Sequence, residues 1–551
     1  MSLRRYWPAL LIALPLWAYI VYPVGAVLSE SLTEPVEAFR ARSMKWNPDA
    51  QPLGAGLRMV FHEAPLREAI WGTLKISVLS AITACALGLL QALLWFRRDF
   101  PGRRFFAVCG YSPMLLPPLV GTLAWYHLAG PTGWIWHWNG GQAWFNGFGQ
   151  VLLLHTYSFA LFPFSLVSAA LQNHDGATEE AARNLGANSP RAFITAVWPA
   201  IRAPLAAGGL LAFMAAAASF SGPYILDNNS RYLTVEILNT NNVGVQRGLS
   251  VVLAVLALAA LPGFLYFNRA SANVSGVKGV ARISFPPDTS MGRFVRLMLS
   301  IPMAFVLLAP PLMVVQGAFY SSVGNDPSLN TVSGFQALQS TDWNALIRST
   351  GYAFAAAGLD LILAVLLALA MRRAGWWASL PGEFAVMLTL ALPGSVVGVA
   401  MLSVFNAGSP LSLGVPLGGT GLILILAYSI RNLPFATRPV RAVMNESGRE
   451  MEWAAAGLGA SKFQVAWRIT LPLILPTLIA AFLICFVSSA GEYVASALLF
   501  DSGTKPVSVR IYELARNYPG EANALALLLM GMTTMAIVLA AWLQRRWSVL
   551  R

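Results

Sequence analysis

A short polar passage, Glu179-Glu180-Ala181-Ala182-Arg183-Asn184-Leu185-Gly186-Ala187, recurs 273 positions later as Glu452-Trp453-Ala454-Ala455-Ala456-Gly457-Leu458-Gly459-Ala460. A proline follows each copy at the same distance, Pro199 after the first and Pro472 after the second. Long apolar segments flank both copies. A polar loop that occurs twice in an otherwise apolar chain predicts two equivalent contacts on one face of a membrane.

The composition places the protein in a lipid bilayer. Of its 551 residues 56% are hydrophobic and only 11% are charged, whereas a soluble domain carries about 25% charged residues. The net charge of +13 does not indicate nucleic-acid binding, because the arginines gather at the ends of apolar segments rather than on a soluble basic face. Three cysteines, all in apolar stretches, make no disulfide framework.

Twelve segments are long and apolar enough to span a bilayer, which takes about 20 residues each. We therefore expect an all-α membrane protein with about 12 transmembrane helices, near 7–29, 69–95, 106–129, 146–171, 204–226, 248–268, 294–318, 349–371, 383–405, 418–438, 473–500 and 523–544. With the N-terminus in the cytoplasm, nearly every connection on that side is rich in arginine, as the positive-inside rule requires. Both termini and both copies of the repeated passage are then cytoplasmic.

A polar stretch divides the chain into two similar halves. Residues 269–293 are rich in Ser, Gly and Pro, which is typical of a linker. The sequence thus predicts a first half at 1–268, a cytoplasmic linker at 269–293 and a second half at 294–551, each half with six spans in the same orientation, as in a parallel repeat. A second echo supports this division: Leu116–Gly121 in the third span resembles Leu392–Gly398 in the ninth.

The repeated passage resembles the EAA motif of ABC-importer permeases, which reads Glu-Ala-Ala, three residues, then Gly, with Leu-Pro downstream. The first copy fits through Glu180, Ala181, Ala182 and Gly186. The second copy keeps its two alanines, its glycine and Leu471-Pro472, but Trp453 stands in the glutamate position and Glu452 lies one residue earlier. The whole chain is similar to the fused, two-half permeases of the iron(III)/thiamine type.

The resemblance implies a type I ABC importer permease of the bacterial inner membrane. Its EAA helices would couple the transport pathway to two copies of an ATP-binding subunit, and an extracytoplasmic substrate-binding protein would deliver the cargo. It assigns coupling to Glu179, Glu180, Ala181, Ala182, Gly186, Glu452, Ala454, Ala455 and Gly459. The chain has no P-loop sequence. We therefore expect that it is not an enzyme and binds no cofactor itself, and that ATP and Mg bind to the partner subunits.

Ionisable groups inside spans are costly and suggest a transport pathway. Asp360 lies in the eighth predicted span and Glu492 in the eleventh, and the corresponding part of the fifth span carries Tyr224 followed by Asp227. Each could instead make an interhelical hydrogen bond. Two buried carboxylates favour a cationic cargo, which for the resembling group means ferric iron, thiamine or a polyamine. No residues are assigned to a metal site.

Two other classes of function remain. A secondary transporter driven by an ion gradient would also have two six-span halves, but it gives no reason for duplicated Glu-Ala-Ala-type loops. A membrane enzyme is less favoured, because the sequence contains no metal cluster, nucleophile elbow or paired carboxylates.

Overall fold

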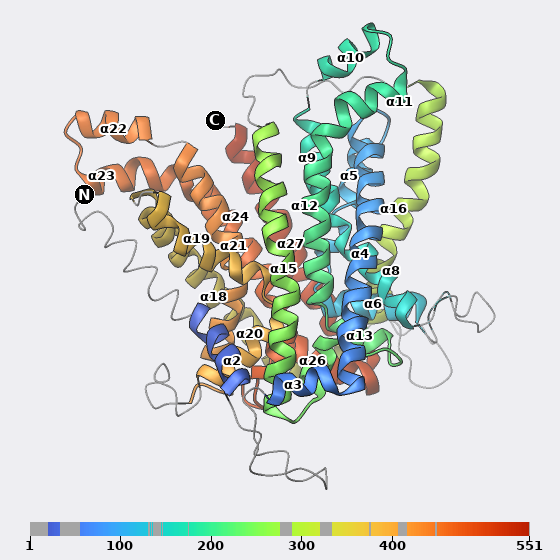
Figure 1. Ribbon diagram of the computed structural model, residues 1–551, viewed down its shortest axis with the longest axis vertical. Helices are drawn as coiled ribbons and strands as arrows, with labels where there is room; N and C mark the ends of the chain where they lie inside the picture. The colour runs from blue at the N-terminus through green and yellow to red at the C-terminus, as the bar shows by residue number, and fades with distance from the viewer. Residues whose placement is uncertain are drawn as a thin grey trace.

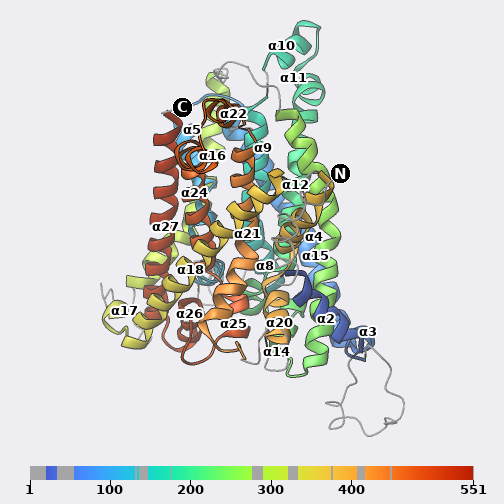
Figure 2. The same ribbon diagram turned by 90° about the vertical axis from the view of Figure 1, so that its left-hand side faces the viewer.

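The protein forms a helical bundle, drawn in two views in Figures 1 and 2. The computed structural model describes residues 20–33, 55–130, 133, 135, 145, 147–174, 176–275, 289–319, 333–373, 376–405, 416–446 and 449–549. Within these ranges every regular element is a helix and none is a β-strand. The all-α class predicted from the sequence is therefore confirmed.

The first half contributes α2 to α15. Its helices are α2 (Tyr22–Thr33), α3 (Ala55–His62), α4 (Ala64–Phe96), α5 (Arg103–Cys109), η4 (Ser112–Leu115), α6 (Pro118–Ala129), α8 (Gly147–Phe159), α9 (Leu161–Gln172), α10 (Gly176–Asn184), α11 (Ser189–Ala192), the π-helical turn η5 (Phe193–Val197), α12 (Trp198–Ala217), α13 (Ser221–Leu226), α14 (Leu233–Asn239) and α15 (Val243–Ser275).

The second half contributes α16 to α27. Its helices are α16 (Ser290–Phe319), α17 (Ser333–Gln336), α18 (Ser340–Arg373), α19 (Trp376–Ala391), α20 (Gly394–Val404), α21 (Gly421–Glu446), α22 (Arg449–Gly457), α23 (Lys462–Val465), the π-helical turn η7 (Ala466–Thr470), α24 (Leu471–Ala490), α25 (Val494–Leu499), α26 (Val507–Asn517) and α27 (Pro519–Val549).

The two halves repeat the same local structure. The five elements from α10 to α13 begin and end 273 residues before those from α22 to α25. Along α4 and α18 the buried positions correspond at a spacing of 276, so that Thr73 matches Ser349. Both hydroxyls accept a backbone N–H from the same place in their half, Thr73 from Leu233 at 2.9 Å and Ser349 from Val507 at 2.7 Å. The second half is thus a structural copy of the first.

Eight described helices are long and apolar enough to cross a membrane, and a bent pair raises the number to nine. The pair, 382–391 and 394–404, bends by 117° at Pro393, since proline cannot donate the next helical hydrogen bond. The predicted span 106–129 is likewise divided, into α5, η4 and α6, and Pro117 lies at the break before α6. The predicted span 418–438 is helical as α21 but carries Arg431 and Arg438.

Two further expectations fall partly outside the described ranges. Residues 7–19 of the first predicted span lie outside these ranges, and α2 belongs to the part of that span that is described. Helix α15 runs on to Ser275 and α16 begins at Ser290, so both enter the range predicted as a linker. The division into 1–268, 269–293 and 294–551 stays a prediction.

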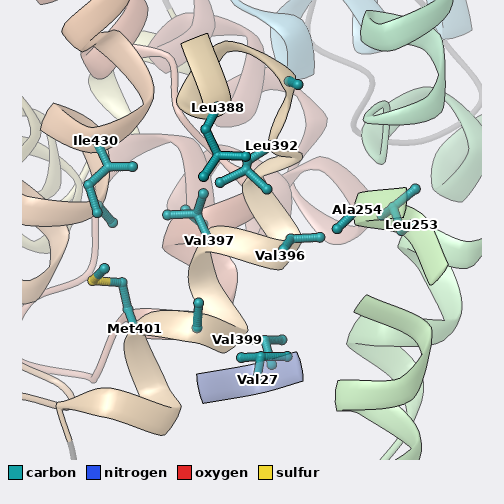
Figure 3. Close-up of a cluster of buried hydrophobic side chains, with 14 of the residues drawn as sticks. Val27, Leu253, Ala254, Leu388, Leu392, Val396, Val397, Val399, Met401 and Ile430 are labelled. Carbon is teal, nitrogen blue, oxygen red and sulfur yellow. The ribbon is translucent and has the colours of Figure 1, made fainter. Parts of the chain in front are cut away.

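The first helix of each half packs against the other half. Helix α2 lies against α20, and α16 correspondingly lies against α6. In Figure 3 Val27 of α2 points toward Val399 of α20, and Leu253 and Ala254 of α15 lie across from Val396. Because this apolar core is shared between the halves, they form one interlocked body rather than two separate bundles.

The polar repeats project from one end of the bundle, which we call the loop end. Helices α10 and α22 both lie there, and so does the C-terminal end of α27. Helices α3, α13 and α26 lie toward the opposite end, the far end (Figure 1). The two copies of the repeated passage therefore share one face of the molecule.

Candidate functional site

Each repeated passage folds as a helix, a glycine turn and a second helix. Gly186 has a φ of +87° and Gly459 a φ of +86°, the left-handed conformation that glycine adopts without steric cost. The amide of Ala187 donates to the carbonyl of Ala182, and that of Ala460 donates to Ala455, both at 3.0 Å. This is the hydrogen-bond pattern of a Schellman motif, so both glycines are required by the same turn.

A side-chain cap starts the second helix of each passage. In the first half Asn188 Oδ1 accepts the amide of Arg191 at 3.1 Å. In the second half Ser461 Oγ accepts the amide of Gln464 at 3.3 Å, while Gln464 Oε1 accepts the amide of Ser461 at 2.8 Å. The second arrangement is a reciprocal capping box. Different residues thus cap the second helix at equivalent positions of the two passages.

One glutamate in each passage is tied to the end of a membrane-spanning helix. Glu179 pairs with Arg97, just beyond α4, at 3.0 Å, and with Arg183 at 2.8 Å. Arg372 Nη1, at the end of α18, donates to Glu452 Oε1 at 2.8 Å, and Arg372 Nη2 makes an ionic contact with Glu452 Oε2 at 2.8 Å. The equivalent glutamates are therefore Glu179 and Glu452, which hold α10 and α22 against the second long helix of each half.

The electrostatics of Glu179 follow from these contacts. Partial burial alone would raise the pKa of its carboxyl, but Arg97 and Arg183 outweigh it and hold the pKa below its ordinary value. Glu179 is thus ionised throughout the physiological range, and the α10 contact persists there.

Both passages carry a leucine that is almost fully exposed on their outer surface. Leu185 is 89% exposed and Leu458 is 90% exposed, at equivalent positions beside the glycine turns. Glu180 is also exposed, and its counterpart Trp453 is 68% exposed. Ala181 and Ala454 are exposed and Ala182 and Ala455 half-buried. The sequence signal for the two leucines was their match at the repeat spacing.

The predicted pathway residues are not brought together in one site. Asp360 is fully buried within the second half, where Ser429 of α21 donates to its Oδ1 at 2.7 Å. Glu492, which follows α24, forms an ion pair with Arg431 of α21. Asp227 accepts two backbone amides through Oδ1 and the Tyr232 hydroxyl through Oδ2 at 2.7 Å, which suits a loop-fixing role. Their assignment to a pathway stays a prediction.

Tyr224, in contrast, belongs to an aromatic cluster between the halves. Phe220 stacks on Tyr493, its own counterpart at the repeat spacing, with ring centroids 5.6 Å apart. Tyr224 contacts Phe220 at 4.9 Å and Tyr512 at 5.6 Å. Both stacked rings are buried. The pair sits where the two copies meet, beside α13 and α25; the shared spacing of Phe220 and Tyr493 could have revealed it.

No group of three or more His, Cys, Asp or Glu side chains that could hold a metal ion occurs among the described residues. Comparison with known proteins identifies the family: residues 84–272 and 360–549 each match the family of binding-protein-dependent transport system inner membrane components. The chain belongs to this family, and its two halves are two copies of the family's domain.

Relatives of full length are fused permeases of ABC transporters. The chain is 26% identical to the probable ABC transporter permease protein y4fN of Sinorhizobium fredii, covering 97% of this chain and 96% of that protein. It is 25% identical to the ferric transport system permease protein FbpB of Actinobacillus pleuropneumoniae, over 81% of this chain and 66% of that protein. It is also 25% identical to the thiamine transport system permease protein ThiP of Salmonella typhimurium, over 86% and 88%. The protein is thus an inner-membrane permease component of a binding-protein-dependent ABC transporter.

Proposed function

We propose that this chain forms the transport pathway of an ABC importer and that two copies of an ATP-binding subunit dock on its loop end, one on α10 and one on α22. The loop end is then cytoplasmic, as are both termini, and an extracytoplasmic substrate-binding protein meets the far end. The observation that carries the proposal is the pair of protruding passages with the same glycine turn and the same nearly uncovered leucine. ATP is hydrolysed on the partner subunits.

Family membership favours this function over a secondary transporter. A gradient-driven transporter needs no duplicated docking surface, whereas two ATP-binding subunits need one each. The ion pairs from Glu179 to Arg97 and from Glu452 to Arg372 give each docking helix a rigid connection to a membrane-spanning helix. Movement of the partner subunits would then be transmitted to both halves.

Co-purification with the ATP-binding subunit tests the docking. Val at both Gly186 and Gly459 forces a β-branched residue into a left-handed conformation, which costs roughly 1–2 kcal/mol at each turn, and should abolish the complex. Val at Gly176 and Gly457 is the matched control, because these glycines lie in the same helices, have open space around them and have ordinary φ values. A complex that survives the first double substitution as well as the control would refute docking on these loops.

For the cargo we propose ferric iron or thiamine. The names of the ferric and thiamine relatives support this choice, since both match most of this chain. The molybdenum transport system permease protein ModB of Mycobacterium bovis matches only 35% of it. Calorimetric titration of the cognate substrate-binding protein with each solute decides between them, and a protein that binds neither overturns the assignment.

A further inference from the structure

A pocket of about 250 Å3 lies between the two halves, on the side toward the loop end. The first half supplies one wall through α15, and the second half supplies the others through the end of α18, α19 and α21. Its charged and polar lining consists of Asn268, Arg269, Glu383, Thr437, Arg438 and Arg441.

The charges in this pocket do not balance. Arg441 pairs with Glu383 at 3.2 Å. Arg438 lies over the Phe264 ring at 5.4 Å and its Nη2 contacts the Met387 sulfur at 2.7 Å; Glu383 attracts it electrostatically, but among the described residues no carboxylate forms an ion pair with it. Arg269 is exposed at the rim with no acidic partner in the same ranges. Two guanidinium groups are therefore available to an anion.

The rest of the lining is apolar. Leu265, Met371, Val386 and Met387 form it, and all belong to helices that run through the membrane toward the loop end. A ligand that fits must combine a negative charge with a hydrocarbon part. Basic pockets between transmembrane helices on the cytoplasmic side bind the phosphate groups of anionic lipids in this way.

The corresponding place in the first half is filled. Trp95, Tyr111 and Phe164 stand where the pocket has Met371, Met387 and Thr437. Their rings pack together, with centroids 5.6 Å apart for Trp95 and Phe164 and 5.2 Å for Tyr111 and Phe164. Ser165 and Ser168 replace the two α21 arginines. The second half thus has smaller side chains than the first at these three positions and arginine at two others. Because the first half has neither feature, the pocket is specific to the second half and does not follow from the repeated fold.

We propose that this pocket binds the phosphate group of an anionic phospholipid, with Arg438 and Arg269 as its ligands and the four apolar side chains against its acyl chains. Because the walls come from both halves, the bound lipid bridges α15 to α21 in this conformation.

The test counts lipids that stay bound to the purified full-length protein by native mass spectrometry, after reconstitution in nanodiscs of mixed phosphatidylglycerol and phosphatidylcholine. We expect selective retention of phosphatidylglycerol, weakened about fivefold by Arg438→Ala or Arg269→Ala, since each arginine near the membrane surface contributes about that factor. Thr437→Phe with Met371→Trp keeps every charge but fills the pocket as in the first half, and should also remove the lipid. Arg104→Ala is the control. Arg104 is exposed in α5 of the first half, so this variant should retain the lipid.

A soluble anion is separated from a lipid by adding millimolar inorganic phosphate. If phosphate competes with the lipid while selective lipid retention still depends on Arg438, the result supports the site. Phosphate binding that depends on Arg438 without any lipid retention would replace the lipid by a soluble anion and overturn the proposal. Retention of phosphatidylglycerol that is equal in Arg438→Ala, Arg269→Ala and Arg104→Ala would overturn it as well.

Discussion

Between Gly176 and Leu226 the first half builds its repeated passage and the following helices with the same boundaries that the second half uses between Arg449 and Leu499. Inside the bundle several polar positions differ. Ser158 and Ser219 in the first half correspond to the Arg431–Glu492 ion pair in the second, and Ala84 corresponds to Asp360. The backbone of the exposed passages therefore keeps the symmetry of the repeat, whereas these charged groups of the interior do not.

The ion pair is the largest such difference, and making the second half like the first tests it. Arg431→Ser or Glu492→Ser alone leaves a largely buried charge without its partner and should lower the free energy of unfolding by about 3 kcal/mol. The double substitution removes both charges and should recover most of that loss. Thermal unfolding in detergent measures it, with Ser158→Ala and Ser219→Ala as controls; a double variant as unstable as either single one contradicts the expectation.

The connection between docking helix and spanning helix should matter in both halves. Arg97→Ala and Arg372→Ala should each lower transport-coupled ATP hydrolysis about fivefold, the equivalent of about 1 kcal/mol for each partly buried ion pair. The Arg372–Glu452 pair should be the more sensitive, because Arg372 is less exposed than Arg97. Exchanging the charges in Arg372→Glu/Glu452→Arg should restore part of the rate. Failure of the exchange together with an unchanged rate in the single variants would show that the pairs do not transmit the motion.

Asp360→Ala places the first-half residue in the second half. The substitution gives up one hydrogen bond from Ser429, worth about 1 kcal/mol, but also removes the cost of burying a carboxyl group. The thermal midpoint should stay the same or rise, and transport should continue, because Asp360 is enclosed within its own half. Loss of transport with an unchanged midpoint would return Asp360 to the pathway. Asp360→Asn is the conservative comparison.

Acid should release α10 only at low pH. Because Arg97 and Arg183 outweigh the effect of burial and depress the pKa of Glu179 below its ordinary value, the contact contributes its stability above that ordinary value and loses it only as the pH falls through the depressed pKa. In Arg97→Ala the loss should begin at a higher pH. Protection of the α10 amides in hydrogen exchange, measured against pH, reports the shift; identical profiles for both proteins would exclude a role for Arg97.

The smallest effect is expected where the two passages differ in sequence. Glu180 and Trp453 are both exposed, so Glu180→Ala and Trp453→Glu should change the free energy of unfolding by less than about 0.5 kcal/mol. If one docking surface uses a glutamate and the other a tryptophan, the two substitutions should alter ATPase stimulation unequally. Equal and negligible effects would mean that the two surfaces bind alike.

The sequence was sufficient for the features that depend on local chemistry. The spacing of 273 predicted one repeated passage in each half, and Gly186 and Gly459 predicted their turns, because a left-handed residue is required within a few positions of the helix end. The sequence did not predict which distant residues pair. That Glu452 reaches Arg372 and that Glu492 reaches Arg431 depends on how helices distant in the chain pack. The prolines within 106–129 signalled the break that the structure has there.

The packing of α2 on α20 can form only after both helices have been synthesised. Ribosomes make α20 roughly 370 residues after α2, which at about 5–20 residues per second is a delay of roughly 20–70 s. During that time α2 can pack on α3 and α15, its main neighbours among the described helices of its own half. The nascent first half must therefore wait in the membrane with one flank covered by lipid or by the insertion machinery, and fusing both halves into one polypeptide ensures that the missing partner arrives beside it.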